Sequence, residues 1–345
     1  MKYKIEKNTV QETLIIPLYA RKVCSELYPN LYQDETAVRL INEIDYDFSD
    51  ADKNARSLMQ RFGSLEVAMR QNDLAWEVRD YLKTHPNAAV VNLGCGLDST
   101  GRSCDNSSCN IYNLDFPDVI AVRNELLPAG EREKNIPCDL NNTEWFRKID
   151  SSNGAVFFAS GVFYYFLTEQ VKTLVQAMAD TFPRGVLVFD AANRTAVKMI
   201  AKTWLKSAKI KDVGAYFAVS DAPKEIGAWD SRLQVSSRGY MLGYNDLKDP
   251  SIGGFFRLLA KVGDGMMKMQ IVKIGFGGGK WRKAENVRRP CNEIHRYAHG
   301  DVGAVCRLIS KPADSGVRLR YEYGKNHHEK SKAEIQGDHL RAARI

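Results

Sequence analysis

The sequence predicts an α/β fold built on a mostly parallel β-sheet. Short apolar runs rich in branched residues recur through the middle of the chain, and stretches with helical spacing separate them. This alternation is typical of βαβ units, whose strands are buried on both faces. The first run also leads directly into a glycine turn, Gly94-Cys95-Gly96. The runs lie at residues 88–93, 111–115, 155–159 and 185–190.

The N-terminal part, residues 1–86, is expected to be a helical cap. Apolar residues there recur at about helical spacing, and His85-Pro86-Asn87 ends the pattern. Pro17 stands early enough in the first helix to be tolerated. The three expected helices cover about residues 11–28, 34–44 and 54–83.

Residues 87–276 are expected to form the α/β domain. The run at 269–276 alternates apolar and polar residues, as an antiparallel strand near a sheet edge would. Residues 191–249 are long for one crossover and are expected to roof a substrate pocket, with Trp204, Tyr216, Trp229 and Tyr240 among their aromatic residues. The other expected elements are helices at 117–127, 168–182, 194–209 and 252–262 and a strand at 232–236.

The positive charge of the chain is confined to its C-terminal end. Residues 280–345 hold fifteen Lys and Arg against eight Asp and Glu, whereas the 279 residues before them hold 34 of each. A glycine run at 277–279 is a plausible hinge, and residues 277–345 are expected to be a basic, mostly disordered tail. A basic tail on a neutral body is weak evidence for nucleic-acid binding, so a nucleic-acid partner is not expected.

The sequence fits a protein of the cytoplasm. No apolar stretch is long enough to span a membrane, and the charged N-terminus does not resemble a signal peptide. Seven cysteines spread thinly along 345 residues suit reduced thiols better than a disulfide framework. The sequence leaves the oligomeric state open.

The turn after the first strand predicts a nucleotide-type cofactor. A strand that runs into Gly94 and Gly96 must turn sharply and can bring a ligand against bare main chain. The motif continues through Asp98, and the helix that follows offers free amide hydrogens. The dinucleotide fingerprint requires a third glycine at position 99, where this chain has Ser99.

Two later strand ends narrow the choice of cofactor. Asp115, followed by Phe116, lies 21 residues past Gly94 and could accept hydrogen bonds from both hydroxyls of a ribose. Asp139 could receive the exocyclic amine of an adenine, with Leu140 against the ring. The glycine turn, Asp115 and Asp139 follow successive strands in this order, which favours S-adenosylmethionine over NAD as the cofactor. Each acid alone could instead be a solvated turn or a helix-capping residue.

The motifs resemble those of one family. The run Val-Val-Asn-Leu-Gly-Cys-Gly-Leu-Asp at 90–98 is similar to the first cofactor motif of the leucine carboxyl methyltransferases and their bacterial polyketide O-methyltransferase-like branch. The resemblance covers about residues 10–276. It implies a Rossmann-like class I methyltransferase with a seven-stranded sheet, S-adenosylmethionine as cofactor and a small-molecule methyl acceptor. Segments 13–21, 44–48, 114–120 and 161–166 also match.

The resemblance also suggests residue roles. In the family an arginine on the long N-terminal helix binds the methionine carboxylate; Arg70 is the best match, and Arg56 and Arg61 are neighbours that stay open. The family usually has an arginine where this chain has Thr100, unless Arg102 replaces it. Many members carry a glutamate where this chain has Ser160, which can donate a hydrogen bond but carries no charge.

The acceptor side offers few candidate bases. A hydroxyl acceptor must lose its proton, whereas a carboxylate needs no base. Asp190 ends a strand at the ligand edge of the sheet, and Tyr164 and Tyr165 follow another strand, so these three are the candidate catalytic residues. His85 precedes the first strand, at the distant edge, and is expected to be structural. No metal is expected, because the spacing of Cys104 and Cys109 has no matching second pair.

These observations predict an S-adenosylmethionine-dependent O-methyltransferase acting on a hydroxyl or carboxyl oxygen of a small, polyketide-like metabolite. Two alternatives stay open. One is an NAD(P)-dependent Rossmann oxidoreductase, which Ser99 disfavours. The other is a non-catalytic member that binds the cofactor, or a nucleic acid through the tail.

Overall fold

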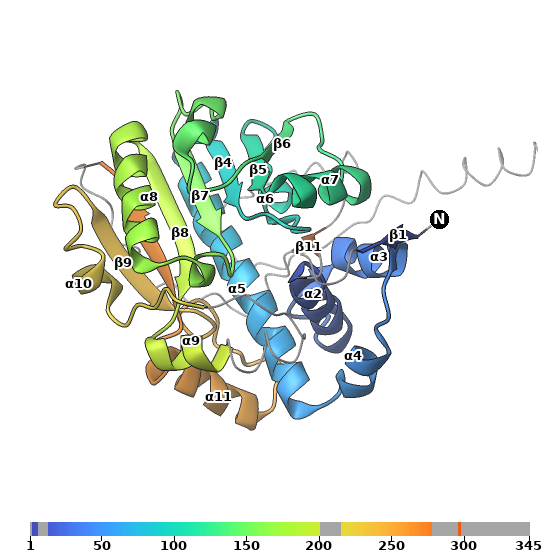
Figure 1. The fold of residues 1–345 in the computed structure, drawn as a ribbon. Coiled ribbons are helices and arrows are strands. Elements are labelled where there is room, and N and C mark those ends of the chain that lie inside the picture. The colour runs from blue at the N-terminus through green and yellow to red at the C-terminus, as the bar shows by residue number, and fades with distance from the viewer. Residues whose placement is uncertain (1, 6–12, 201–214, 278–295, 298–345) are drawn as a thin grey trace, which may run out of the picture. The chain divides into compact units, whose positions relative to one another are not determined.

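A seven-stranded sheet runs through the computed structural model, which describes residues 2–5, 13–200, 215–277 and 296–297 (Figure 1). The strands lie in the order β6-β5-β4-β7-β8-β10-β9. Strand β10 is antiparallel to β8 and β9, and the other neighbouring pairs are parallel. This confirms the predicted, mostly parallel sheet. The strands are β4 (Ala89–Leu93), β5 (Asn110–Asp115), β6 (Glu133–Pro137), β7 (Ala155–Ala159), β8 (Gly185–Ala191), β9 (Gln234–Gly239) and β10 (Gln270–Gly275).

The strand order reverses at β4. The chain leaves β4 toward β5 and β6 on one side, then crosses to β7 and β8 on the other. In open α/β sheets, ligands bind beyond the carboxyl ends of the strands at such a reversal. The glycine turn at 94–96 follows β4 directly and therefore lies at this point.

Helices cover both faces of the sheet. In β7, Val156 and Phe158 join the apolar cluster of helix α5 (Leu58–Leu82), and Phe157 joins the cluster of α8 (Thr168–Thr181). This alternation explains why the strands are apolar throughout. The other helices are α6 (Thr100–Ser103), α7 (Pro117–Leu126), α9 (Arg194–Ile200), α10 (Ala222–Glu225) and α11 (Gly254–Gly265), with 3₁₀ turns η1 (Thr143–Lys148) and η2 (Phe163–Tyr165).

The helical cap differs from the prediction at the start of its longest helix. The helix predicted at about 54–83 is α5, which begins at Leu58, and a separate short helix, α4 (Ser49–Asn54), ends where the long helix was expected to begin. The break is explained by Ser57, which is extended and whose side chain accepts a hydrogen bond from the Gln60 amide at 3.3 Å. Such an N-cap starts a new helix.

The cap packs onto the loop after β4. Helices α2 (Ile15–Leu27) and α3 (Glu35–Glu43) share one apolar cluster with α7 and with Leu97 of that loop. Residues 1–300 form one compact unit. The cap therefore belongs to the same body as the sheet and covers the region where a ligand would lie.

Two short parallel pairs lie outside the main sheet. Strand β1 (Tyr3–Lys4) pairs with β3 (Ile44–Asp45), and β2 (Gln33–Asp34) pairs with β11 (Arg296–Tyr297). Apart from Gly277 and β11, the predicted tail at 277–345 lies outside the described residues, as does 201–209 of the helix predicted at 194–209. Within the described ranges, no helix is long and apolar enough to cross a membrane.

Candidate active site

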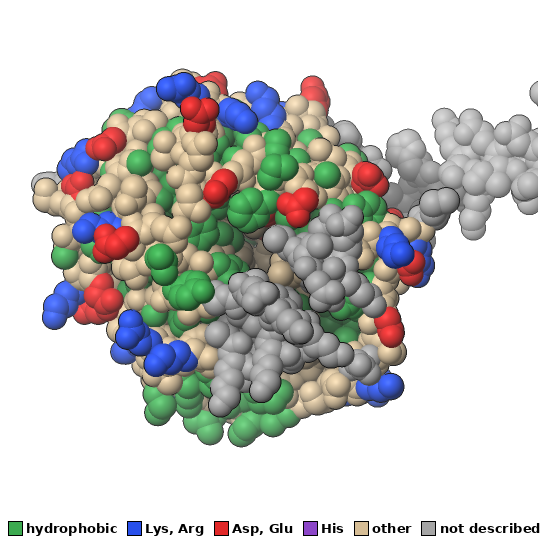
Figure 2. Space-filling model, in the orientation of Figure 1, with side chains coloured by type: hydrophobic (Ala, Val, Ile, Leu, Met, Phe, Trp, Pro, Cys, Tyr) green, Lys and Arg blue, Asp and Glu red, His purple; other side chains and the backbone are tan. Residues whose placement is uncertain are grey.

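A cavity of about 480 Å³ opens at the carboxyl ends of β4, β5 and β7. Its wall combines the loops after these strands with residues of α2 and α5. On the face of the molecule that Figure 2 shows, hydrophobic side chains gather around the middle. The cavity thus lies where the strand order reverses, between the sheet and the cap.

The glycine turn forms the part of the wall nearest the sheet. Gly94 has φ +65° and Gly96 φ +46°, in the left-handed region that favours glycine. A Cβ at Gly94 would lie 2.5 Å from a methyl carbon of Val162. Cys95 between them is buried. Both glycines are therefore required, and main chain faces the cavity here.

Asp98 supports this turn from within. Its Oδ1 accepts hydrogen bonds from the amide and the hydroxyl of Thr100, both at 2.7 Å. Its Oδ2 accepts from the side-chain amide of Asn92 at 3.0 Å. Asp98 contributes to the cavity wall, but its carboxylate is already occupied by the loop it stabilises.

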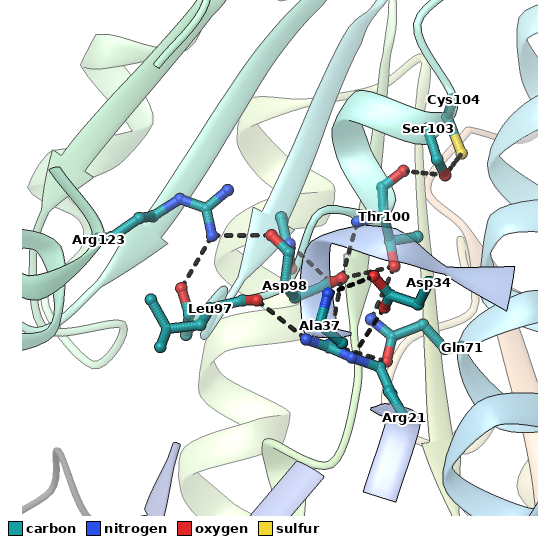
Figure 3. A network of polar contacts seen from close by, with 12 residues as sticks. Arg21, Asp34, Ala37, Gln71, Leu97, Asp98, Thr100, Ser103, Cys104 and Arg123 are labelled. Atoms are coloured by element: carbon teal, nitrogen blue, oxygen red, sulfur yellow. Dashed lines mark hydrogen bonds and ion pairs between the residues drawn. The ribbon is translucent and has the colours of Figure 1, made fainter. Parts of the chain in front are cut away.

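Two buried arginines complete the support of the loop (Figure 3). Arg123 donates to the carbonyls of Gly96 at 2.8 Å and Asp98 at 2.7 Å. Arg21 donates to the carbonyl of Leu97 at 2.9 Å and pairs with Asp34 at 3.1 Å. Because helix α2 supplies Arg21, the cap helps to hold the turn in shape.

Asp115 ends β5 beside the turn, as the spacing predicted. Its Oδ2 accepts from the Gly96 amide at 2.8 Å, and its Oδ1 accepts from the Phe116 amide at 2.8 Å. Burial raises the pKa of this carboxyl. Both residues line the cavity, and Phe116 is 44% exposed.

Asp139 and Leu140 take different positions. Leu140 is buried and lines the cavity. Asp139 is exposed outside the cavity wall, and its Oδ1 accepts from the amide of Asn141 at 2.9 Å and from that residue's side chain at 3.0 Å. This is the turn arrangement considered above as the alternative, and Asn141 lines the cavity in place of Asp139.

Of the three arginines considered for the methionine carboxylate, Arg70 lines the cavity. Arg56 is exposed, and the guanidinium of Arg61 lies over the ring of Phe256, 5.3 Å from its centroid. Arg70 pairs with Asp190, Nη1 to Oδ2 at 3.1 Å.

Asp190, a candidate catalytic residue, lies behind the cavity wall. It is 2% exposed, and its Oδ1 accepts from the Gly161 amide at 2.6 Å while Oδ2 holds Arg70. Gly161 has φ +72°, and a Cβ there would lie 3.1 Å from the Arg70 guanidinium. Asp190 therefore positions Arg70 against the turn after β7 instead of facing a ligand.

Three polar atoms of the cavity wall have no partner. The Ser160 hydroxyl, the Tyr164 hydroxyl and Arg70 Nε are buried and make no hydrogen bond within the described structure. Buried polar groups are nearly always paired, so these atoms indicate a polar ligand. An amino acid moiety with a carboxylate and an amine fits this set, and the bare turn with Asp115 fits a nucleoside.

The cavity wall also contains aromatic side chains and a carboxylate that the sequence reasoning missed. Tyr240 donates from its hydroxyl to Glu66 Oε1 at 3.0 Å, and both line the cavity. Burial raises the pKa of Glu66. Glu66 lies one turn before Arg70 on α5, and this spacing was the available signal. Tyr164 is buried and Tyr165 is 44% exposed, and both line the cavity.

The aromatic residues expected to roof the pocket lie in different places. Tyr240 lines the cavity, Trp229 packs against Phe217 with centroids 6.3 Å apart, and Tyr216 is 55% exposed. Trp204 lies outside the described residues. Residues 234–239 of the segment expected to roof the pocket form β9 at the edge of the sheet, which confirms the strand predicted at 232–236.

Residues 16–179 match the family model of the leucine carboxyl methyltransferases. The matched part of the chain is similar to the leucine carboxyl methyltransferase family. It is 30% identical over 186 residues to the tetracenomycin polyketide synthesis O-methyltransferase TcmP of Streptomyces glaucescens, a match that covers 53% of this chain and 66% of that protein, just under two thirds of its length.

Two further matches are one protein compared by sequence and one solved structure. The chain is 25% identical over 258 residues to the S-adenosyl-L-methionine-dependent methyltransferase dpfgK of Gibberella zeae, covering 70% of this chain and 85% of that protein. A solved structure of a candidate methyltransferase from Thermobifida fusca superposes with a TM-score of 0.50 at 16% identity, over 72% of this chain and 96% of that one. The similarity to the Thermobifida fusca structure shows a shared fold.

This chain departs at two places from the pattern that the resemblance to the leucine carboxyl methyltransferases implies. Arg102 does not replace the missing arginine in the wall, because it pairs with Glu133 at 2.6 Å. Ser160 occupies the position of the usual glutamate and lines the cavity.

His85 stacks on Tyr81, with ring centroids 4.3 Å apart. The described residues contain no group of three or more His, Cys, Asp and Glu placed to hold a metal ion.

Proposed function

We propose that this chain is an S-adenosylmethionine-dependent methyltransferase that methylates an oxygen of a small molecule. One observation carries the proposal. A turn of bare main chain at the reversal of the strand order opens onto one cavity that also holds Asp115 and Arg70. These are the groups that a nucleoside joined to an amino acid requires.

Different residues of the cavity wall would bind different parts of the methyl donor. The Gly94–Gly96 main chain would lie against the adenosyl unit, Asp115 would accept the ribose hydroxyls, and Leu140 would contact the adenine. Arg70 would pair with the methionine carboxylate, and Ser160 would hydrogen-bond nearby. The bound donor supplies a methyl group that its sulfonium already activates.

The residues therefore contribute mainly by orientation and by exclusion of water. Transfer is an in-line displacement, and holding the acceptor oxygen in near-attack contact supplies much of the acceleration. Leu14 and Leu18 of the cap are buried and line the cavity, so the cap shields the reacting atoms from solvent.

The acceptor end favours an apolar, unsaturated molecule. Its wall contains Ile16, Val67, Tyr164, Phe166 and Tyr240. Aromatic walls bind flat ring systems by stacking and by edge contacts. The relative TcmP is described as acting in polyketide synthesis, which supports a polyketide-like acceptor with a hydroxyl or carboxyl oxygen.

A direct test is calorimetric titration of the protein with S-adenosylhomocysteine, S-adenosylmethionine and NAD. We expect the first two to bind and NAD not to bind, because buried Ser99 stands where the dinucleotide fingerprint needs glycine. NAD binding without S-adenosylhomocysteine binding would favour the oxidoreductase instead.

The Asp115→Ala variant provides the residue-level prediction. Removing an acceptor for two ribose hydroxyls should weaken S-adenosylhomocysteine binding by about tenfold or more, since each hydrogen bond to a charged group contributes about 1.5–3 kcal/mol. Circular dichroism should show the fold intact. Unchanged affinity would mean that the ribose contact is assigned to the wrong residue.

A further inference from the structure

Among the described wall residues, Glu66 carries a charge that neither the donor nor the support of the glycine turn explains. It is half-buried on α5, and Tyr240 donates to its Oε1 at 3.0 Å. Its second oxygen takes no hydrogen bond from the described residues. A carboxylate held by one neutral partner keeps an acceptor site available for a ligand.

The cations of the described wall are already paired with acids. Arg21 pairs with Asp34 at 3.1 Å, and Arg70 pairs with Asp190 at 3.1 Å. No lysine or histidine stands among the wall residues that the structure describes. Glu66 forms no ion pair with any described residue. A second carboxylate beside it would be repelled at low dielectric, because the nearby cation, Arg70, is already paired with Asp190.

The surroundings of Glu66 make it a better base than an exposed glutamate. Burial raises the pKa of its carboxyl, and the Tyr240 hydrogen bond and the charge of Arg70 lower that pKa in part. Burial also raises the pKa of Asp264, which acts on Glu66 from α11. The charged or titratable groups that face Glu66 are Arg70 on its own helix, Tyr164 on η2, Asp190 on β8, Tyr240 after β9 and Asp264 on α11.

We propose that the acceptor is a phenol or an enol and that Glu66 receives its proton. The inference rests on the proposed function and chooses a hydroxyl over a carboxyl oxygen. A bond forms between the acceptor oxygen and the methyl carbon, and the bond from that carbon to sulfur breaks. Sulfur keeps the electron pair and becomes neutral, and the hydroxyl proton moves to Glu66.

The test uses 2-naphthol and 2-naphthoate, two flat probes that differ in the group presented to Glu66. Each is titrated into the protein saturated with S-adenosylhomocysteine at about pH 8, where the hydroxyl of 2-naphthol is neutral. We expect 2-naphthol to bind about tenfold more tightly than 2-naphthoate, since like charges at low dielectric oppose binding. In Glu66→Gln, which keeps the shape and can still accept from Tyr240, this preference should disappear through a gain in 2-naphthoate affinity.

A second readout follows methyl transfer from labelled S-adenosylmethionine to 2-naphthol. Loss of the base should lower kcat about 100-fold in Glu66→Gln, while the affinity for S-adenosylhomocysteine stays within about twofold, the scatter expected when no donor contact is lost. Glu125→Gln, an exposed change on α7, is the matched control and should alter neither value.

Two results would overturn the assignment of Glu66. One is a wild-type protein that binds 2-naphthoate at least as well as 2-naphthol, and the other is a preference that Glu66→Gln leaves unchanged. Both leave the proposed function standing as long as S-adenosylhomocysteine binds. A wild-type protein that does not bind S-adenosylhomocysteine would instead overturn the proposed function and this inference with it.

Discussion

At the scale of single residues, the cavity separates side chains that hold the protein together from side chains that stay available. Asp98 and Asp190 have both carboxylate oxygens occupied by protein donors. The hydroxyls of Ser160 and Tyr164 are buried without a partner among the described residues. The first pair builds the site, and the second pair is free to bind a ligand.

Asp190 is predicted to act on the donor only through Arg70. In Asp190→Asn the guanidinium loses its charged partner, so Arg70 should be less well oriented toward a carboxylate. S-adenosylhomocysteine should then bind about tenfold more weakly, a loss of about 1.4 kcal/mol, close to the lower end of the roughly 1.5–3 kcal/mol of a charged hydrogen bond. Methylthioadenosine, which lacks the amino acid, should bind as it does to the wild type. Calorimetric titration measures both affinities.

The control for this prediction is Asp180→Asn, because Asp180 is an exposed residue of α8 that pairs with Arg232 at the surface. It should leave both affinities unchanged. An equal loss of affinity for both ligands in Asp190→Asn would show that Asp190 supports the whole site and not the Arg70 contact.

Sequence spacing predicted the wall residues that follow strands, because a strand end fixes where the next residue lies. Gly94, Gly96 and Asp115 are examples, and all three line the cavity. Sequence spacing did not predict Glu66 as a wall residue, because a glutamate one turn from an arginine on a helix is also the pattern of a solvated ion pair. Asp139 shows the reverse case, in which a local turn uses the carboxylate.

At the scale of elements, the break between α4 and α5 sets where the long helix begins. Ser57 caps α5 from an exposed position, so its side chain contributes through the cap and not through packing. Ser57→Ala should therefore lower the free energy of unfolding by about 1 kcal/mol. Ser57→Asp, which preserves a cap acceptor, should not. Urea denaturation of both variants tests this, and an unchanged midpoint in Ser57→Ala would contradict it.

The turn after β9 is held by a carboxyl group that titrates near neutral pH. The Leu242 amide donates to Asp264 Oδ2 at 3.0 Å, and burial raises the pKa of Asp264 to about 7. The folded state therefore binds this proton more tightly than the unfolded chain does. Stability from Asp264 is fully present below about pH 4 and is lost as the pH rises to about 7, by up to about 1.4 kcal/mol per unit.

Asp264→Asn should remove this part of the pH dependence. Urea unfolding at several pH values between about 4 and 7 should show a shallower decline of stability in the variant than in the wild type. Asp180→Asn, at an exposed site, should keep the wild-type slope. Equal slopes in the wild type and Asp264→Asn would place the pKa of Asp264 in its ordinary range.

Most strands of the sheet were predictable because each is apolar on both faces and bounded by turn residues, as β7 and β8 show. Their order in the sheet was not, because pairing between strands distant in sequence leaves no local signal. The break before α5 was missed for a different reason. Residues 54–57 contain no glycine or proline that would end a helix, and only the cap at Ser57 marks the new start.

At the scale of the whole molecule, the fold brings distant segments to one cavity. Helix α2 of the cap, α5, the ends of β4, β5 and β7, and Tyr240 after β9 all contribute to the wall. The resemblance to a known family supplied the expected seven-stranded sheet and Arg70. Tyr240 was expected to roof the pocket, but its contact with Glu66 followed only from the structure, because it depends on how the edge strands β9 and β10 return toward α5.

A crystal structure of the protein with S-adenosylhomocysteine is the most direct measurement of the central claim. It should show the adenosyl unit against the main chain of Gly94–Gly96, the ribose hydroxyls on Asp115 and the carboxylate on Arg70. Ligand density elsewhere on the protein, or the same turn packed against protein with the ligand absent at saturating concentration, would contradict the account.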